Sequence, residues 1–260
     1  ADNHAAMVRE LEAHGQSYDL EDHRAILQRT GAFLDQWGFR AAFPTDDAFY
    51  LSVGTKVYDA WENYHENIRI GDAVDIAAIS GWETTAIENH SGIVDNLRGF
   101  KADPEIVRRS LLPVRPCAKQ RRLVYDLSEV AALDLYLFND TNRPVPGDLT
   151  LSVVAPDGQE RRVGHWPVPA HRRDVFSQLV AQDVALPAFD QPGTWQVRFA
   201  HSAAPDATFT RDLLVVPPAA PLPRAVRIAV AGVAQSVQRQ LAALPGVTIE
   251  PFRAGVTYDG

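Results

Sequence analysis

A short apolar run, Ile76-Ala77-Ala78-Ile79-Ser80, places the strongest constraint on how this chain can fold. The run is too short for a helix and lacks the alternation of a half-buried strand. It is typical of a strand buried on both faces of a parallel sheet, and we predict a strand at about residues 74–80. Gly81-Trp82-Glu83 follows directly, and after it comes a polar segment that contains Glu88, Asn89, His90 and Asp95. A (β/α) barrel builds its active site from such side chains at the C-terminal ends of its strands.

Two amphipathic helices are predicted before this run. After a candidate N-cap at Asp19, apolar side chains recur on one helical face up to Trp37, and Gly38 is well placed as the C′ residue. The second helix begins near Thr45 and ends at Gly71. Its apolar stripe consists of Val57, Trp61, Tyr64 and Ile68, and its polar side holds Glu62, His65 and Glu66. We expect His65 and Glu66 to be solvated helix residues rather than metal ligands.

Short helical patterns also occur before Gly15 and between Asp103 and Pro113. Residues 1–110 therefore offer one strand and much apolar helix surface, which cannot complete a sheet. We predict that they are the C-terminal segment of a (β/α)8 barrel whose beginning lies outside this chain.

The pattern changes after residue 110 to short runs in which apolar and polar residues alternate. Examples are residues 133–137, 149–153, 195–199 and 209–216, separated by turn signals such as Pro156-Asp157-Gly158. Short strands at this spacing predict an immunoglobulin-like β-sandwich over residues 111–217. Within it, Cys117 is expected to be a strand residue and Trp195 a core residue rather than a sugar platform.

A proline-rich linker at residues 218–224 separates the sandwich from the C-terminal segment. Strand, helix and strand are predicted in turn over residues 225–260, which would be the start of an α/β domain. The fold class is therefore multidomain, α/β plus all-β.

Composition narrows the classes of partner. The net charge of −8 argues against nucleic acid, because binding to phosphates needs a basic footprint. One cysteine permits neither an intrachain disulfide nor a cysteine-based metal site, and no run of 18 apolar residues is present to span a membrane. A single glycine after the strand at residue 226 is a weak nucleotide signal, so we expect no cofactor and no metal. The N-terminal residues do not resemble a signal peptide, and the compartment is not indicated.

A tryptophan face can stack on a sugar ring, and carboxylates accept hydrogen bonds from hydroxyl groups. Glycoside cleavage needs two carboxyl groups, about 5–5.5 Å apart for retention or about 6.5–9.5 Å apart for inversion. Glu83 and Glu88 are one conceivable pair. The alternative, which we favour, is that one of them orders the loop while the other binds a hydroxyl, because paired catalytic acids in barrels usually come from different strands.

These motifs resemble the end of the catalytic barrel in glycoside hydrolase family 2, which includes β-galactosidases, β-glucuronidases and β-mannosidases. The resemblance rests on Gly81-Trp82-Glu83, on residues 88–92 (ENHSG) and on residues 95–101 (DNLRGFK), and the order of barrel, sandwich and accessory domain also fits. It implies a retaining hydrolase whose acid/base and nucleophile glutamates lie upstream, so no catalytic role is assigned within this chain.

Trp82 would line the sugar subsite, with Glu83, Glu88, Asn89 and His90 as its neighbours, and the partner would be a carbohydrate substrate. An oligomer is compatible with the sequence. The alternative functions are a non-catalytic carbohydrate-binding or scaffolding β-sandwich protein and a barrel that has lost its chemistry.

Overall fold

The computed structural model describes residues 2–15, 19–71, 73–79, 81–83, 92–217 and 224–258. Helices form the N-terminal part: α1 (His4–Ala13), α2 (Leu20–Gln36), the 3-10 helix η1 (Phe39–Ala41), α3 (Asp46–Gly71) and α4 (Glu105–Ser110). The two long helices predicted from the sequence are confirmed. Gly38 follows the end of α2 with φ = 70°, a left-handed conformation that favours glycine and turns the chain into η1.

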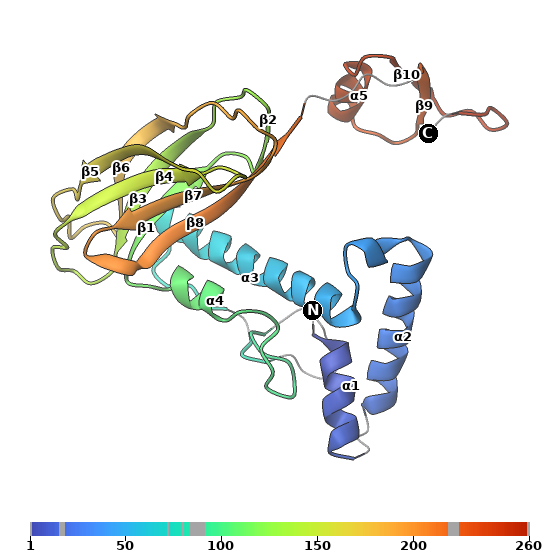
Figure 1. Ribbon diagram of the computed structural model, residues 1–260, viewed down its shortest axis with the longest axis horizontal. Helices are drawn as coiled ribbons and strands as arrows, with labels where there is room; N and C mark the ends of the chain where they lie inside the picture. The colour runs from blue at the N-terminus through green and yellow to red at the C-terminus, as the bar shows by residue number, and fades with distance from the viewer. Residues whose placement is uncertain are drawn as a thin grey trace.

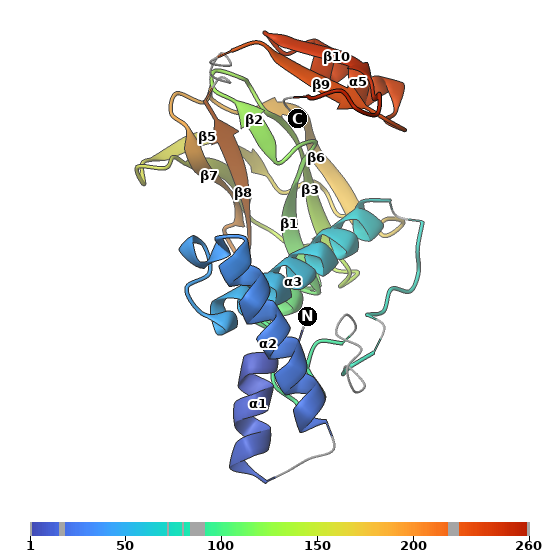
Figure 2. The same ribbon diagram turned by 90° about the vertical axis from the view of Figure 1, so that its right-hand side faces the viewer.

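Helix α3 lies between the α1–α2 pair and the strands (Figure 1). Figure 2 shows the same order from the side, with the β-sheets above α3 and with α1 and α2 extending below it. Because α3 is 26 residues long, it contacts α1, α2, α4 and the sandwich at different points along its length.

Residues 114–216 form two sheets. The first has the order β1-β3-β6, with β1 (Val114–Gln120), β3 (Ala132–Asn139) and β6 (Ser177–Ala185) all antiparallel. The second has the order β2-β8-β7-β4-β5, made from β2 (Val124–Asp126), β8 (Ala204–Val216), β7 (Gly193–His201), β4 (Asp148–Val154) and β5 (Glu160–Pro167). The four alternating runs noted in the sequence are β3, β4, β7 and β8, so those strand predictions are confirmed.

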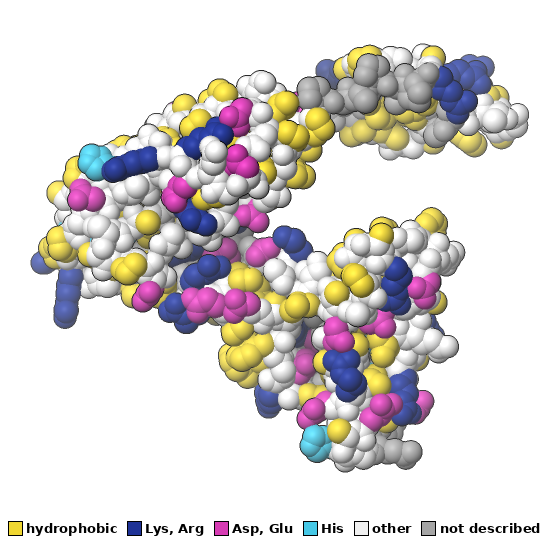
Figure 3. Space-filling model, viewed as in Figure 1, with side chains coloured by type: hydrophobic (Ala, Val, Ile, Leu, Met, Phe, Trp, Pro, Cys, Tyr) yellow, Lys and Arg dark blue, Asp and Glu magenta, His cyan; other side chains and the backbone are white. Residues whose placement is uncertain are grey.

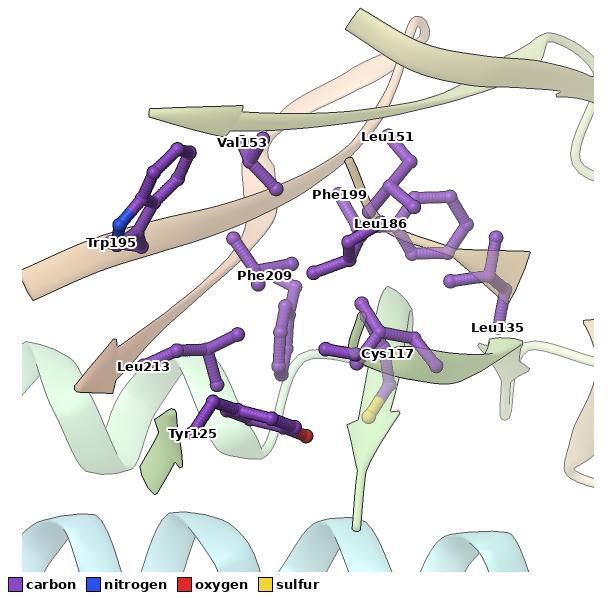
Figure 4. Packing of buried hydrophobic residues seen from close by; sticks show 14 of the residues in the cluster. Cys117, Tyr125, Leu135, Leu151, Val153, Leu186, Trp195, Phe199, Phe209 and Leu213 are labelled. Carbon is purple, nitrogen blue, oxygen red and sulfur yellow. The ribbon is translucent and has the colours of Figure 1, made fainter. Parts of the chain in front are cut away.

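One apolar core fills the space between these two sheets. Figure 4 shows side chains from both sheets pointing toward one another, among them Leu135 and Cys117 from the first and Leu151 and Phe209 from the second. Trp195 is fully buried in this core, and its indole Nε1 donates a hydrogen bond to the carbonyl of Gln191 at 3.0 Å. Trp195 and Cys117 are therefore core residues, as predicted.

The C-terminal segment contains β9 (Val226–Val230), α5 (Gln235–Ala242) and β10 (Val247–Pro251). The two strands pair in parallel, with Ile228 opposite Ile249, so the predicted strand–helix–strand unit is confirmed. The chain as a whole mixes helices with sheets, and strands predominate. The barrel and immunoglobulin-like assignments and the domain boundaries remain predictions.

Candidate functional site

The predicted strand at residues 74–80 is wrong for the residues that the structure describes. Residues 73–79 have no strand pairing, and the side chain of Ile76 is 85% exposed. A strand exists only where its backbone groups pair with a neighbour, and the described part of this chain offers none beside these residues. Trp82 and Glu83 are consequently not delivered by a barrel strand, and another feature must hold them.

That feature is a turn at residues 92–101, which packs against helix α3. The carbonyl oxygen of Trp82 accepts hydrogen bonds from the backbone N–H groups of Ile93 (2.9 Å) and Val94 (3.1 Å). Val94 in turn forms isolated bridges with both Glu83 and Phe100. The backbone at Trp82 is therefore fixed by the turn.

Helix α3 holds this turn through Tyr58, which is fully buried. The hydroxyl of Tyr58 donates to the carbonyl of Ile93 and accepts from the backbone N–H of Lys101 at 3.2 Å. Burial raises the pKa of Tyr58 above its ordinary value, so the hydroxyl keeps the proton that it donates. One side chain thus joins both strands of the turn to the helix.

The Asp95–Lys101 run forms the tip of this turn. One carboxylate oxygen of Asp95 accepts the backbone N–H groups of Leu97 (2.9 Å) and Gly99 (2.8 Å), while Arg98 sits at φ = 70°. Burial raises the pKa of Asp95, although those two hydrogen bonds oppose the rise. Within the described residues this run forms a folded turn, in which Asp95, Arg98 and Lys101 each have a structural partner, whereas the buried Oδ1 of Asn96 has none among them.

Lys101 closes the turn onto the N-terminal segment. Its Nζ lies 2.8 Å from Oδ1 of Asp2, and both side chains are almost fully buried. A buried ion pair resists separation, because removing one partner leaves an uncompensated charge. The sequence analysis missed this pair, since two residues 99 positions apart carry no local signal of their contact.

Trp82 and Glu83 themselves lie side by side at the surface. The Trp82 side chain is 58% exposed, whereas the carboxylate of Glu83 forms an ion pair with Arg98 in the same turn. This contact favours a loop-ordering role for Glu83. The other predicted site residues, Glu88, Asn89 and His90, lie outside the described residues.

The polar side of α3 is buried rather than solvated, which corrects the sequence analysis. Glu62 and Glu66 face two arginines of the sandwich: Arg115 lies 2.7 Å from Glu62 and 2.9 Å from Glu66, and Arg211 lies 2.7 Å from Glu66. Burial raises the pKa of Glu62, while Arg115 pulls it down. The predicted stripe residue Tyr64 is exposed instead. Val57 and Trp61 of the predicted stripe are only partly buried. The buried residues of α3 are Tyr50, Gly54, Tyr58, Glu62, His65 and Glu66.

His65 is also buried on this side of α3. Its Nδ1 lies 2.9 Å from the hydroxyl of Ser110, which donates to the carbonyl of Val107. Burial lowers the pKa of His65, and the nearby Arg69 and Arg115 lower it further. The Ser110 side chain is inaccessible, so this pair links α3 to α4 and does not present a nucleophile.

A cavity of about 330 Å³ lies at the C-terminal end of α3. The segment that was predicted as a strand lines it with Val74, Asp75 and Ala77. On the opposite wall, Arg69 bonds to Asp140 and to the carbonyl of Leu112, each at 2.9 Å, and stacks on Phe138 at 4.4 Å from the ring centre. These contacts of Arg69 join helix α3 to the sandwich.

Groups of three or more His, Cys, Asp or Glu side chains that could hold a metal do not occur among the described residues. None of the helices in the described ranges is long and apolar enough to cross a bilayer.

Glycoside cleavage needs two carboxyl groups, whereas the described part of the loop places one beside Trp82, and that one is held by Arg98. What the described loop can offer chemically is an exposed aromatic side chain on a fixed backbone, next in sequence to a charged pair.

No protein-family model matches this chain, and no curated protein sequence matches it. Among solved structures, a β-glucosidase from Listeria innocua in complex with gluconolactone is similar at 11% identity and a TM-score of 0.29, covering 39% of this chain and 16% of that one. The Pseudomonas fluorescens alkylpurine DNA glycosylase AlkC bound to DNA containing an abasic site analog is similar at 13% identity and a TM-score of 0.27, covering 43% and 33%. This chain spans about a sixth of the β-glucosidase. The structural neighbours thus include glycosidases and a DNA glycosylase, and similarities at this level establish neither a shared fold nor a family.

Proposed function

We propose that this chain is part of a retaining glycoside hydrolase that cleaves O-glycosidic bonds, with Trp82 as a ring platform for the sugar. The observation that carries the proposal is the combination of a fixed backbone and a free ring at Trp82. Its carbonyl is held by two N–H groups of the turn, while its side chain is 58% exposed. An exposed aromatic side chain on a backbone that is already fixed loses less conformational entropy on binding a ligand than one on a mobile segment.

The resemblance to glycoside hydrolase family 2 supports this proposal, since it rests on the same residues 81–101. In this proposal the two catalytic glutamates belong to barrel strands outside these 260 residues. Glu83 holds the loop through Arg98, and Glu88, Asn89 and His90 are the remaining candidates for contact with the sugar.

The alternative, a β-sandwich that binds carbohydrate without catalysis, has less support. Trp195 is fully buried, and Trp166 is partly buried against the sandwich core, with its ring centre 6.4 Å from that of Phe199. Neither tryptophan of the sandwich therefore presents an open ring face comparable with that of Trp82.

The test uses the natural protein that contains this chain. Hydrolysis of p-nitrophenyl β-galactoside, β-glucuronide and β-mannoside is measured for the parent and for Trp82→Ala. We expect kcat/KM on the preferred glycoside to fall at least about tenfold, the equivalent of 1.4 kcal/mol of transition-state binding.

Trp37→Ala is the matched control, because Trp37 is equally exposed but follows helix α2, away from the turn. Its kcat/KM should stay within about twofold of the parent. Near-normal kinetics for Trp82→Ala would refute the platform, and a comparable loss in both variants would show a general effect on folding. If the parent protein hydrolysed none of these glycosides, the glycosidase proposal itself would be refuted.

A further inference from the structure

A second cleft lies away from the turn, where α3 and α4 meet the five-stranded sheet. Its volume is about 620 Å³, within the range of about 300–1,000 Å³ that is usual for small-molecule sites. Figure 3 shows charged side chains of both signs gathered at this junction between the helices and the sandwich. The cations that line the cleft are Lys56, Arg109, Arg121, Arg122 and Arg211, and the acids are Asp59, Glu62 and Asp212. Positive charge is therefore in excess, in a chain whose net charge is −8.

Most of these cations already have a carboxylate partner. Lys56 pairs with Asp59 at 2.9 Å, Arg122 with Glu129 at 2.8 Å, and Arg121 with Asp183. Arg211 pairs with Glu66 as described above. These side chains shape the cleft, but their charge is largely neutralised.

Arg109 is different. It is half-buried on α4, it forms no ion pair with any described residue, and its buried Nε has no hydrogen-bond partner among them. Its charge is nonetheless close enough to act on Glu62. Glu62 is already held by Arg115 at 2.7 Å, so it does not neutralise Arg109.

Counting the buried cluster together with Arg109 gives three arginines (Arg109, Arg115 and Arg211) against two glutamates (Glu62 and Glu66). Within this cluster one positive charge is left over. The wall of the cleft is mostly polar, and Asp212 is its other charged side chain that forms no ion pair with a described residue. A half-buried guanidinium without a partner is unfavourable, and a bound anion would relieve it through charge-assisted hydrogen bonds.

We propose that this cleft binds an oxyanion, a carboxylate, sulfate or phosphate group, through Arg109. The cleft is large enough for the oxyanion to be carried by a molecule of monosaccharide size. Gln120, Gln196 and Thr210 also line it and supply neutral hydrogen-bonding groups for the remainder of such a ligand. The site is separate from Trp82 and stands independently of the proposed hydrolase activity.

The test titrates the 260-residue chain with sodium phosphate, sodium sulfate and sodium glucuronate by calorimetry, at constant ionic strength set with chloride. We expect saturable binding of at least one probe below about 50 mM, which Arg109→Gln weakens about tenfold. Tighter binding of glucuronate than of phosphate and sulfate would identify a sugar acid as the ligand. Equal binding would identify a free oxyanion.

Two further variants separate binding from folding. Arg173→Gln removes an exposed arginine between β5 and β6 that has no ion pair with a described residue, and it should leave the affinity unchanged. Asp212→Asn removes a repelling carboxylate from the cleft wall and should tighten binding several-fold, which a damaged protein would not do. The absence of binding by all three probes, or an unchanged affinity in a folded Arg109→Gln variant, would overturn the proposal.

Discussion

Helix α3 and the turn at residues 92–101 approach so closely at Gly54 that an added methyl group cannot fit. A Cβ built there would lie 2.1 Å from the carbonyl oxygen of Lys101 and 2.9 Å from its carbonyl carbon. Ordinary carbon–oxygen contacts are at roughly 3.3–3.6 Å, so Gly54→Ala must move helix and turn apart by about 1 Å. Both obstructing atoms belong to the backbone and cannot rotate away.

The sign of the effect is what makes Gly54→Ala informative. In an unobstructed helix interior the change stabilises by about 0.5–1 kcal/mol, since alanine loses less entropy on folding. Here forced overpacking costs about 1–3 kcal/mol. Separation also breaks the hydrogen bond between the Lys101 N–H and the Tyr58 hydroxyl, for about 1 kcal/mol more. The structure therefore predicts a net loss of about 2 kcal/mol in the free energy of unfolding.

Urea unfolding followed by circular dichroism and tryptophan fluorescence measures this change. Gly71→Ala is the control, because Gly71 is the last residue of the same helix and an added Cβ there meets no atom within 4 Å. It should leave the free energy of unfolding unchanged or raise it slightly. If Gly54→Ala were as stable as the parent or more stable, the docking of the turn against α3 would be refuted.

Two further predictions concern buried charge and protonation. Arg115→Met should lower the free energy of unfolding by about 3–5 kcal/mol, because it removes the close partner of the buried Glu62 and leaves Arg211 alone to face Glu62 and Glu66. The double variant Arg115→Met, Glu62→Met should lose less, and an equal or larger loss on urea unfolding would contradict the pairing. Burial lowers the pKa of both His65 and His201. Below about pH 6.5 these histidines are therefore protonated in the unfolded chain before they are protonated in the folded chain. The free energy of unfolding should then decrease as the pH is lowered, by up to about 1.4 kcal/mol per pH unit for each histidine. His65→Gln should make that fall shallower, and an unchanged slope in urea titrations at several pH values would refute the assignment.

Local patterns along the chain predicted much of the secondary structure. The spacing of apolar residues up to Trp37, with Gly38 behind it, identified α2, and alternation identified β3, β4, β7 and β8. These signals suffice because each depends on residues within one or two turns of a helix or along one strand. The burial of Trp195 followed from the same alternation.

The candidate site was predicted less well. Residues 81–83 and 92–101 of the predicted segment are joined through the backbone of Trp82 and Val94, but the strand that should have carried them is absent from the described residues 73–79. The turn is instead held by Tyr58, Gly54 and Asp2, which lie far away in the sequence. These contacts leave no periodic pattern in the sequence. They depend on the hydroxyl of Tyr58, on the absence of a side chain at Gly54 and on the buried carboxylate of Asp2.

The sequence by itself determined where α2, α3 and strands β3, β4, β7 and β8 lie, because propensity and apolar spacing act over short distances. Only the tertiary structure decided which face of α3 is buried. Glu62 and Glu66 are ordinary surface residues until Arg115 and Arg211 of the sandwich are placed opposite them, and the cost of burying a carboxylate depends on that partner. Pairing between residues far apart in the chain is a property of the folded molecule, and at this junction it outweighs the hydrophobic pattern of the helix.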